Sequence, residues 1–488
     1  MVNFMHSFFT NITAPAFLPV IIFIICKVLK MKTKKAFLSG LYAGIGLEGF
    51  MLLINAFTPI VSPIVKQMVD STGIHLPIID LGWQTASVFA YSSEIGLVFF
   101  AFAIVFQVFL FFIKWTDIFL PSDLWLNYTY MIWGAMLYVA TGNWILSFGL
   151  MVILNLFSIL IFEIISNRWS KYYKYPNCTI ISMHNTEASL FLILIDPLLN
   201  LLKLNKVKIN PKRLKEKLGI FGEPATLGLL VGLFIGFLGN ISRLDSLVAW
   251  GQITKLGIVL AALMLIFPKI AGIFGQAFKP MAEAANKSIL GGNEEGAKNS
   301  TENKKPIVKK SKKWFIGVDD STGYGEPATL LTGTILIPIM LCMALILPGN
   351  ETLPMVDLIS LPFMIESIIA LTNGNMIKVI ITATMWYSAG LYMCTWTAPY
   401  YTHAAEIAGI ALTSGALMIT SFNMMAQPIA GAIFFAFLTQ NPLWIGLVIV
   451  IYFICFIIVK TQKAKIHGYI ERQAAKNDKA SAEEEWAS

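Results

Sequence analysis

Glutamate residues stand at the start of two long hydrophobic segments, within a phrase that occurs twice in the chain. The phrase Gly-Glu-Pro-Ala-Thr-Leu spans residues 222–227 and again residues 325–330, and an aromatic residue precedes each copy. The carboxylates are Glu223 and Glu326, and each is followed by a helix-breaking proline. Irregular backbone at membrane depth persists only where it lines a cavity or is buried in protein. The two copies therefore predict the mouths of a polar recognition site.

The two glutamates have different neighbours. Glu223 closely follows a basic segment, residues 203–217, which holds seven lysine and arginine residues. A helix cap and a ligand-binding residue are equally good interpretations of Glu223, because acidic side chains suit helix N-termini. Glu326 ends a stretch of polar residues and glycines that begins at Asp319. A re-entrant hairpin explains this stretch best. We therefore interpret Glu326 as ligand-facing and Glu223 as partly structural.

Three more acidic residues at such borders are candidates, namely Glu94, Asp319 and Asp320. An ionisable residue at membrane depth is costly unless it is paired or faces a watery cavity. Glu94 follows serines and has no cation nearby in the sequence, which favours ligand binding. Glu48 lies among glycines in an apolar segment, and we interpret it as pairing with a polar group across a helix interface.

His184 precedes another apolar segment, with Ser182, Asn185 and Thr186 as neighbours. A lone histidine is more often a satisfied core residue than a catalytic one. However, a neutral imidazole offers one donor and one acceptor, which suits a polyhydroxylated ligand. No second His or Cys stands at metal-ligand spacing, and nucleotide-binding and serine-hydrolase motifs are absent from the sequence. We therefore predict no metal, no cofactor and no ATP-driven step.

Aromatic residues could complete a sugar site, because aromatic rings cover the C–H faces of sugars while carboxylates and amides bind their hydroxyls. The candidates are Trp83, Trp133, Trp144 and Tyr324. The alternative is a belt of interfacial aromatic residues, as expected for other tryptophans of the chain.

The elements that carry these residues are predicted to be membrane helices. Hydrophobic residues make up 56% of the 488 residues and charged residues 13%, whereas soluble proteins carry roughly a quarter charged residues. The sequence predicts an all-α polytopic protein with roughly ten to twelve membrane elements. The excess of positive charge, +8 in total, lies in short loops between apolar segments. We therefore interpret these cations as setting the orientation of the protein in the membrane, not as a nucleic-acid-binding surface. No cleavable signal peptide is expected.

Basic loops set the predicted orientation, with the N-terminus outside and the C-terminus in the cytoplasm. We predict a membrane domain over residues 1–460, a polar cytoplasmic loop over 279–313 and a charged cytoplasmic tail over 461–488. The polar residues 82–94 predict a re-entrant turn. Thr141-Gly142-Asn143 predicts a tight turn between two helices or a break in one helix.

Several motifs together resemble one family of transporters. They are Asp80-Leu81-Gly82-Trp83, residues 140–144 (Ala-Thr-Gly-Asn-Trp), His184, residues 221–224 (Phe-Gly-Glu-Pro), Gly317-Val318-Asp319 and residues 348–354 (Pro-Gly-Asn-Glu-Thr-Leu-Pro). Their order and spacing resemble the galactitol-type IIC, or permease, component of the bacterial phosphotransferase system, within the ascorbate-galactitol superfamily. The resemblance covers nearly the whole chain.

The resemblance implies a homodimer in the bacterial cell membrane, in which each subunit has a scaffold domain and a mobile core domain with two re-entrant hairpins. The core would carry a polyol or sugar across the membrane by an elevator-like movement. A separate IIB component, charged through IIA, would then phosphorylate the substrate. This chain would be a transport subunit with no phosphorylated residue or catalytic domain of its own.

The same resemblance implies the site residues. It places Glu94 in the first hairpin, His184 on a core helix and Asp319 with Glu326 near the second hairpin. Trp83, Gln84, Thr129 and Glu223 complete the predicted substrate-binding set.

Three positions depart from the galactitol pattern. Glu94 stands in place of Gln, Thr129 in place of His, and the second Gly-Glu-Pro in place of a Gly-His pair, so the exact polyol is not predicted. The alternative function is a secondary polyol or sugar transporter that couples to protons through Glu94, Glu223 or Glu326.

Overall fold

The computed structural model describes residues 19–20, 22–24, 26–27, 30–72, 76–120, 124–207, 209, 219–290, 314–408 and 418–484. Three regions lie largely or wholly outside this part: residues 13–26, which the sequence predicts as the first apolar segment, the basic segment 203–217, and residues 291–313 of the predicted polar loop.

Helices dominate the described chain, as predicted. Their bounds are α3 (Thr33–Thr72), α4 (Trp83–Ser92), α5 (Glu94–Phe112), α6 (Leu124–Thr141), α7 (Trp144–Tyr173), α8 (Met183–Leu201), α10 (Pro224–Asn240), α11 (Leu247–Leu290), α12 (Pro327–Ile346), α13 (Leu361–Met364), α14 (Glu366–Leu371), α15 (Met376–Ile407), α16 (Phe422–Met425), α17 (Pro428–Leu438) and α18 (Pro442–Glu484). Short 3-10 turns occur at η1 (Leu204–Lys206), η2 (Gly219–Gly222), η3 (Ile241–Arg243), η4 (Asp320–Thr322) and η5 (Asp357–Ser360).

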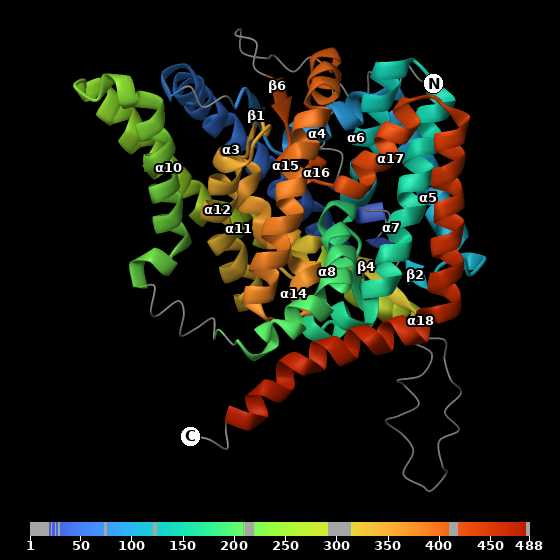
Figure 1. Ribbon diagram of the computed structural model, residues 1–488. Coiled ribbons are helices and arrows are strands. Elements are labelled where there is room, and N and C mark those ends of the chain that lie inside the picture. The colour runs from blue at the N-terminus through green and yellow to red at the C-terminus, as the bar shows by residue number, and fades with distance from the viewer. Residues whose placement is uncertain are drawn as a thin grey trace, which may run out of the picture.

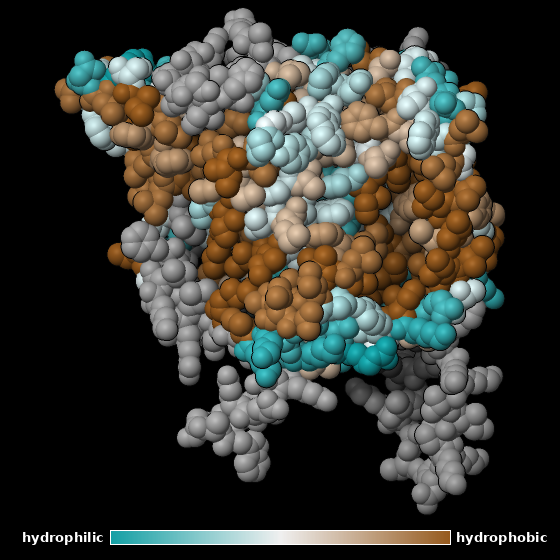
Figure 2. Space-filling view, in the orientation of Figure 1, coloured by the Kyte–Doolittle hydropathy of each residue, from teal (hydrophilic) through white to brown (hydrophobic). Residues whose placement is uncertain are grey.

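The surface has the hydrophobic band of a membrane protein. Among the described residues, five helices are long and apolar enough to cross a membrane, lying within α5, α7, α11, α12 and α18. Figure 2 shows hydrophobic residues in a broad band, with hydrophilic residues gathered along the top and the base of the molecule. The predicted polytopic all-α class is therefore confirmed.

The break predicted at Thr141-Gly142-Asn143 is confirmed, and it separates two helices. α6 ends at Thr141 and α7 begins at Trp144. Gly142 has a φ of +65°, a conformation that glycine adopts at little cost. The side chain of Asn143 caps α7 by accepting a hydrogen bond of 3.0 Å from the N–H of Leu146.

Both copies of the repeated phrase begin helices. Pro224 is the first residue of α10 and Pro327 the first of α12, where a proline costs nothing because its missing N–H would have no helical partner. The residues 82–94, predicted as a re-entrant turn, contain α4 and the start of α5, and Ser93 separates the two helices.

Helices α3, α10 and α11 pack against one another at one side of the molecule (Figure 1). Glycines on α10 allow the close approach. A Cβ placed on Gly232 would lie 2.6 Å from the carbonyl oxygen of Leu256 on α11. Small residues serve in this way at helix interfaces within membranes.

Six short strands in the described part of the chain form two three-stranded parallel sheets. The strands are β1 (Ile78–Asp80), β2 (Ile118–Phe119), β3 (Cys178–Ile180), β4 (Phe315–Val318), β5 (Thr352–Leu353) and β6 (Met418–Thr420). The order is β5-β1-β6 in one sheet and β2-β4-β3 in the other. Each central strand thus comes from one half of the chain and its two neighbours from the other half. Parallel pairing brings the carboxyl ends of the three strands together at one edge of each sheet.

The predicted charged tail is the continuation of a membrane helix. α18 runs without interruption from Pro442 to Glu484. Figure 1 shows it descending along one side of the molecule and then bending to run across the base. The buried Glu163 of α7 binds α18, with Lys460 Nζ at 2.7 Å and Lys463 Nζ at 3.1 Å from its carboxylate oxygens.

Candidate substrate-binding site

His184 lies among several polar side chains near the end of the sheet formed by β2, β4 and β3. α8 begins directly after β3, and Asp319 and Asp320 directly follow β4, so the parallel pairing of these strands places the residues together. Nδ1 of His184 lies 3.2 Å from Oγ1 of Thr129. Its Nε2 atom lies 3.4 Å from Oδ2 of Asp320. The imidazole therefore has a polar partner on each nitrogen.

Asn185 strengthens this arrangement. Its Nδ2 atom donates a hydrogen bond to Oδ2 of Asp320, and its backbone carbonyl accepts one of 2.8 Å from Oγ of Ser367 on α14. The first turns of α8 and α14 are thereby joined. The side-chain Oδ1 atom of Asn185 is buried and has no hydrogen-bond partner in the described part of the chain.

Glu366 completes the group, which we call the polar cluster: Thr129, His184, Asn185, Asp320 and Glu366. Its side chain is fully buried. A Cβ placed on Gly323, in the turn after Asp320, would lie 2.4 Å from Oε2 of Glu366, so a larger residue there would require the carboxyl group to move. Burial, and then the neighbouring Asp320 and Asp319, raise the pKa of Glu366 well above its usual range.

Trp83 is connected to the polar cluster through Tyr128. The ring centroids of Trp83 and Tyr128 are 6.4 Å apart, and those of Tyr128 and His184 are 6.3 Å apart. Both pairs meet edge to face, an arrangement that aromatic rings favour.

The other predicted aromatic residues pack in different places. Trp133 is fully buried against Phe434. Trp144 stacks on Phe148 and is 42% exposed, which is typical of an interfacial residue.

The acidic residues predicted from the sequence separate into several environments. Glu326 caps α12, since its Oε2 atom accepts hydrogen bonds from the N–H of Thr329 at 2.7 Å and from its Oγ1 at 2.8 Å. Glu223 occupies the same position before α10, but its side chain is exposed and makes no capping bond. The sequence predicts Glu223 as the structural residue of the pair, but the residue that caps its helix is Glu326. A ligand role for either residue stays a prediction.

The remaining predicted residues lie as follows. Glu94 is exposed at the first position of α5, and Asp319 is buried beside Asp320. The side chain of Gln84 lies outside the described part. Glu48 is exposed on α3, and its pairing across a helix interface stays a prediction. Gly49, the next residue, takes the buried side of the helix against Ile270.

The first sheet holds a second pair of buried carboxylates, Asp80 and Asp357. Four backbone N–H groups donate to Asp80, at 2.7–3.1 Å. Asp357 accepts from the N–H groups of Trp83 and Asn423 and from Oγ of Ser421. Each carboxylate oxygen of Asp80 and Asp357 accepts at least one hydrogen bond from the protein. We therefore interpret the two residues as a structural junction between the segments that follow β1, β5 and β6.

Glu366 and Asp357 were not predicted from the sequence. A signal existed for Glu366, because it interrupts the apolar segment 361–371, and an ionisable residue inside such a segment is a functional candidate. Asp357 carries no comparable signal, since it lies in a loop-like stretch.

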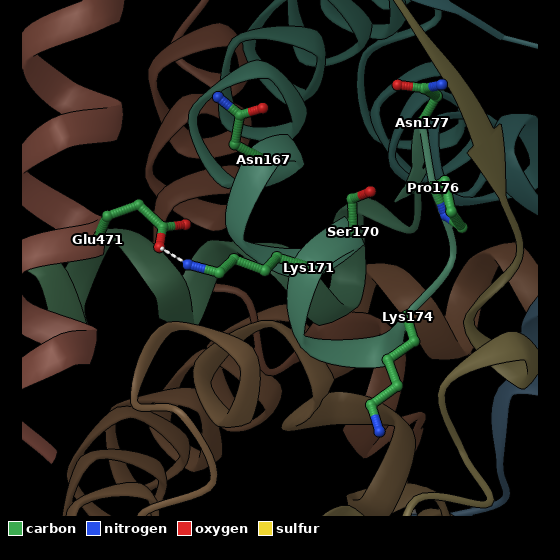
Figure 3. Close-up of a pocket in the computed structure, with 7 residues that line it drawn as sticks. All are labelled: Asn167, Ser170, Lys171, Lys174, Pro176, Asn177 and Glu471. Atoms are coloured by element: carbon green, nitrogen blue, oxygen red, sulfur yellow. Dashed lines mark hydrogen bonds and ion pairs between the residues drawn. The ribbon is translucent and has the colours of Figure 1, made fainter. Parts of the chain in front are cut away.

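A separate pocket has a volume of about 550 Å³ (Figure 3). It is lined by the end of α7, the loop after it and Glu471 of α18. Lys171 binds Glu471 at 2.8 Å across the pocket, while Lys174 points away from this ion pair. No residue of the polar cluster lines it.

Comparison with known proteins bears on this architecture. The family described as "PTS system sugar-specific permease component" matches residues 7–415. This chain belongs to that family of phosphotransferase-system permeases. The resemblance to galactitol-type IIC components is therefore confirmed. The galactitol-specific EIIC component of Escherichia coli (strain K12) is 27% identical over 430 residues, covering 87% of this chain and 88% of the relative.

A second relative is also named as a permease IIC component. The protein named "Putative permease IIC component" of Escherichia coli (strain K12) is 23% identical over 421 residues, covering 86% of this chain and 91% of the relative. The family match and the apolar helices establish a membrane protein of the phosphotransferase system.

Proposed function

We propose that this permease component binds and translocates a polyol or sugar, galactitol or a related hexitol or pentitol, by an elevator-like movement. A separate IIB component, charged by IIA, phosphorylates the substrate at the cytoplasmic side. The single observation that carries the proposal is the polar cluster around His184, inside a chain of this permease family. The galactitol-specific name of the first relative supports the substrate class.

The chemistry of the polar cluster suits a polyol. A polyol hydroxyl both donates and accepts hydrogen bonds, so it can pair with imidazole, amide and carboxyl groups at once. His184, Asn185 and Asp320 provide these three groups within one buried region. Trp83 lies two ring contacts away and can cover a C–H face of the substrate.

The proposed orientation places the base of the molecule in the cytoplasm. Lys171 and Lys174 lie at the end of α7, and Lys171 pairs with Glu471 of α18. Lys460 and Lys463 belong to α18 as well, and this helix runs across the base in Figure 1. Cytoplasmic loops of membrane proteins carry such an excess of cations. In this orientation α18 ends inside the cell, and IIB approaches the base. A homodimer in the cell membrane completes the proposal.

Uptake into membrane vesicles tests this function against proton-coupled transport. With IIB, IIA and the general phosphocarriers supplied inside, we expect phosphorylated polyol to accumulate, and we expect no accumulation without them. Accumulation of free polyol that an uncoupler abolishes would refute the proposal and favour a secondary transporter.

A further inference from the structure

The fully buried carboxyl group of Glu366 has neither oxygen hydrogen-bonded within the described part of the chain. Buried polar groups of native proteins nearly always have a partner, so such an exception requires an explanation. The indole N–H of Trp169 lies close enough to act as a donor that lowers the pKa of Glu366, but it forms no well-aligned hydrogen bond with either carboxyl oxygen in the described part of the chain.

Among the described residues, no cation forms an ion pair with the carboxyl group of Glu366. The acidic residues that act on Glu366 are Asp319, Asp320 and Glu326, and each of them disfavours its charged form. From α7, Tyr173 donates its hydroxyl to the backbone carbonyl of Glu366, not to its carboxyl group. The described residues thus hold Glu366 in place through its backbone but leave both carboxyl oxygens without a well-aligned hydrogen bond.

Glu187 provides a comparison within the same region. It is also buried, at 3% exposure, but its two oxygens accept hydrogen bonds of 3.1 and 2.9 Å from the N–H groups of Ile429 and Ala430 at the start of α17. Glu187 therefore has a clear structural role that Glu366 lacks.

The position of Glu366 connects it to the polar cluster. The next residue, Ser367, binds the backbone carbonyl of Asn185, whose side-chain Oδ1 atom is also unpartnered. Gly323 lies against the carboxyl group and belongs to the turn that follows Asp320. Two unsatisfied acceptor groups thus lie on adjoining helix starts beside the His184–Asp320 pair.

We propose that Glu366 is a further substrate-binding residue, whose carboxyl group forms a hydrogen bond with a hydroxyl group of the bound polyol. Oδ1 of Asn185 accepts from the same ligand. This inference rests on the proposed function, since it takes a polyol as the ligand. It explains why a buried carboxyl group has no well-aligned hydrogen bond in the described part of the chain.

The test measures polyol binding and melting temperature of the purified full-length protein. The panel contains galactitol, other hexitols and pentitols, and the variants are Glu366→Leu, Glu366→Gln and the control Glu187→Leu. We expect Glu366→Leu to bind about tenfold more weakly or worse, because the unpaired ligand hydroxyl is left in a buried site. Its melting temperature should equal or exceed that of the wild type, because an unsatisfied buried group is removed. Glu366→Gln should retain most of the affinity, and Glu187→Leu should melt at a lower temperature.

Two results would overturn the role of Glu366. One is wild-type affinity in Glu366→Leu, and the other is a fall in its melting temperature as large as that of Glu187→Leu, which would mark a structural residue. If the wild-type protein binds no polyol of the panel, the proposed function itself fails, and the ligand class assigned here fails with it.

Discussion

The backbone N–H of Asp357 donates a hydrogen bond of 2.7 Å to the carboxylate of Asp80, although the two residues lie 277 positions apart in the chain. β1 ends at Asp80, and β5 lies a few residues before Asp357. The junction therefore fixes one half of the chain to the other where the strands of the first sheet end.

Asp80→Ala should destabilise the protein severely. It removes the acceptor of four buried backbone N–H groups, and each unsatisfied group costs about 1–3 kcal/mol. We expect a large fall in melting temperature and in the yield of folded protein. Asp245→Ala, at an exposed position, is the control. A melting temperature equal to that of this control would show that the junction is dispensable.

The ion pairs between α7 and α18 predict that one substitution restores stability lost through two others. In the double variant Lys460→Met with Lys463→Met, the fully buried Glu163 loses both cations. An uncompensated buried charge costs about 3–5 kcal/mol. Adding Glu163→Gln removes that charge, so thermal denaturation should show the triple variant to be more stable than the double variant. A triple variant that melts below the double variant would contradict this account.

The close contact of α10 with α11 predicts that Gly232 tolerates no larger residue. Gly232→Leu forces the helices apart, because even a Cβ would lie 2.6 Å from the carbonyl oxygen of Leu256. We expect a lower melting temperature than for Gly251→Leu, since Gly251 on α11 has open space around it. Equal melting temperatures of the two variants would rule out this tight interface.

The sequence predicts the helices far better than the contacts between them. The break at Gly142 is visible locally, because a Thr-Gly-Asn triplet interrupts an apolar segment. The strands were not predicted, since two to four residues carry no detectable alternation and their partners lie hundreds of positions away. The sequence predicts Glu223 as the structural residue because it follows a basic segment, but the capping bond is made by Glu326. The repeated phrase itself is the same in both copies, so only the folded environment decides which glutamate caps its helix.

Glu326 provides a test that separates capping from ligand binding. Glu326→Ala removes the cap of α12 and should cost about 1 kcal/mol of stability. Glu326→Gln keeps an acceptor oxygen and should remain nearly as stable as the wild type. If Glu326 also binds substrate, this Gln variant loses transport more severely than Glu48→Gln. Equal transport by both Gln variants at equal expression would leave Glu326 with its capping role alone.

The central claim is that the polar cluster around His184 binds the transported substrate. The most direct measurement is the equilibrium affinity of the preferred polyol for purified wild-type protein, His184→Ala and the control His403→Ala, whose side chain is 59% exposed. We expect His184→Ala to bind at least about tenfold more weakly, because it removes a group that bonds both Thr129 and Asp320 at the site. The control should bind like the wild type. Unchanged affinity in a folded His184→Ala variant would contradict the claim.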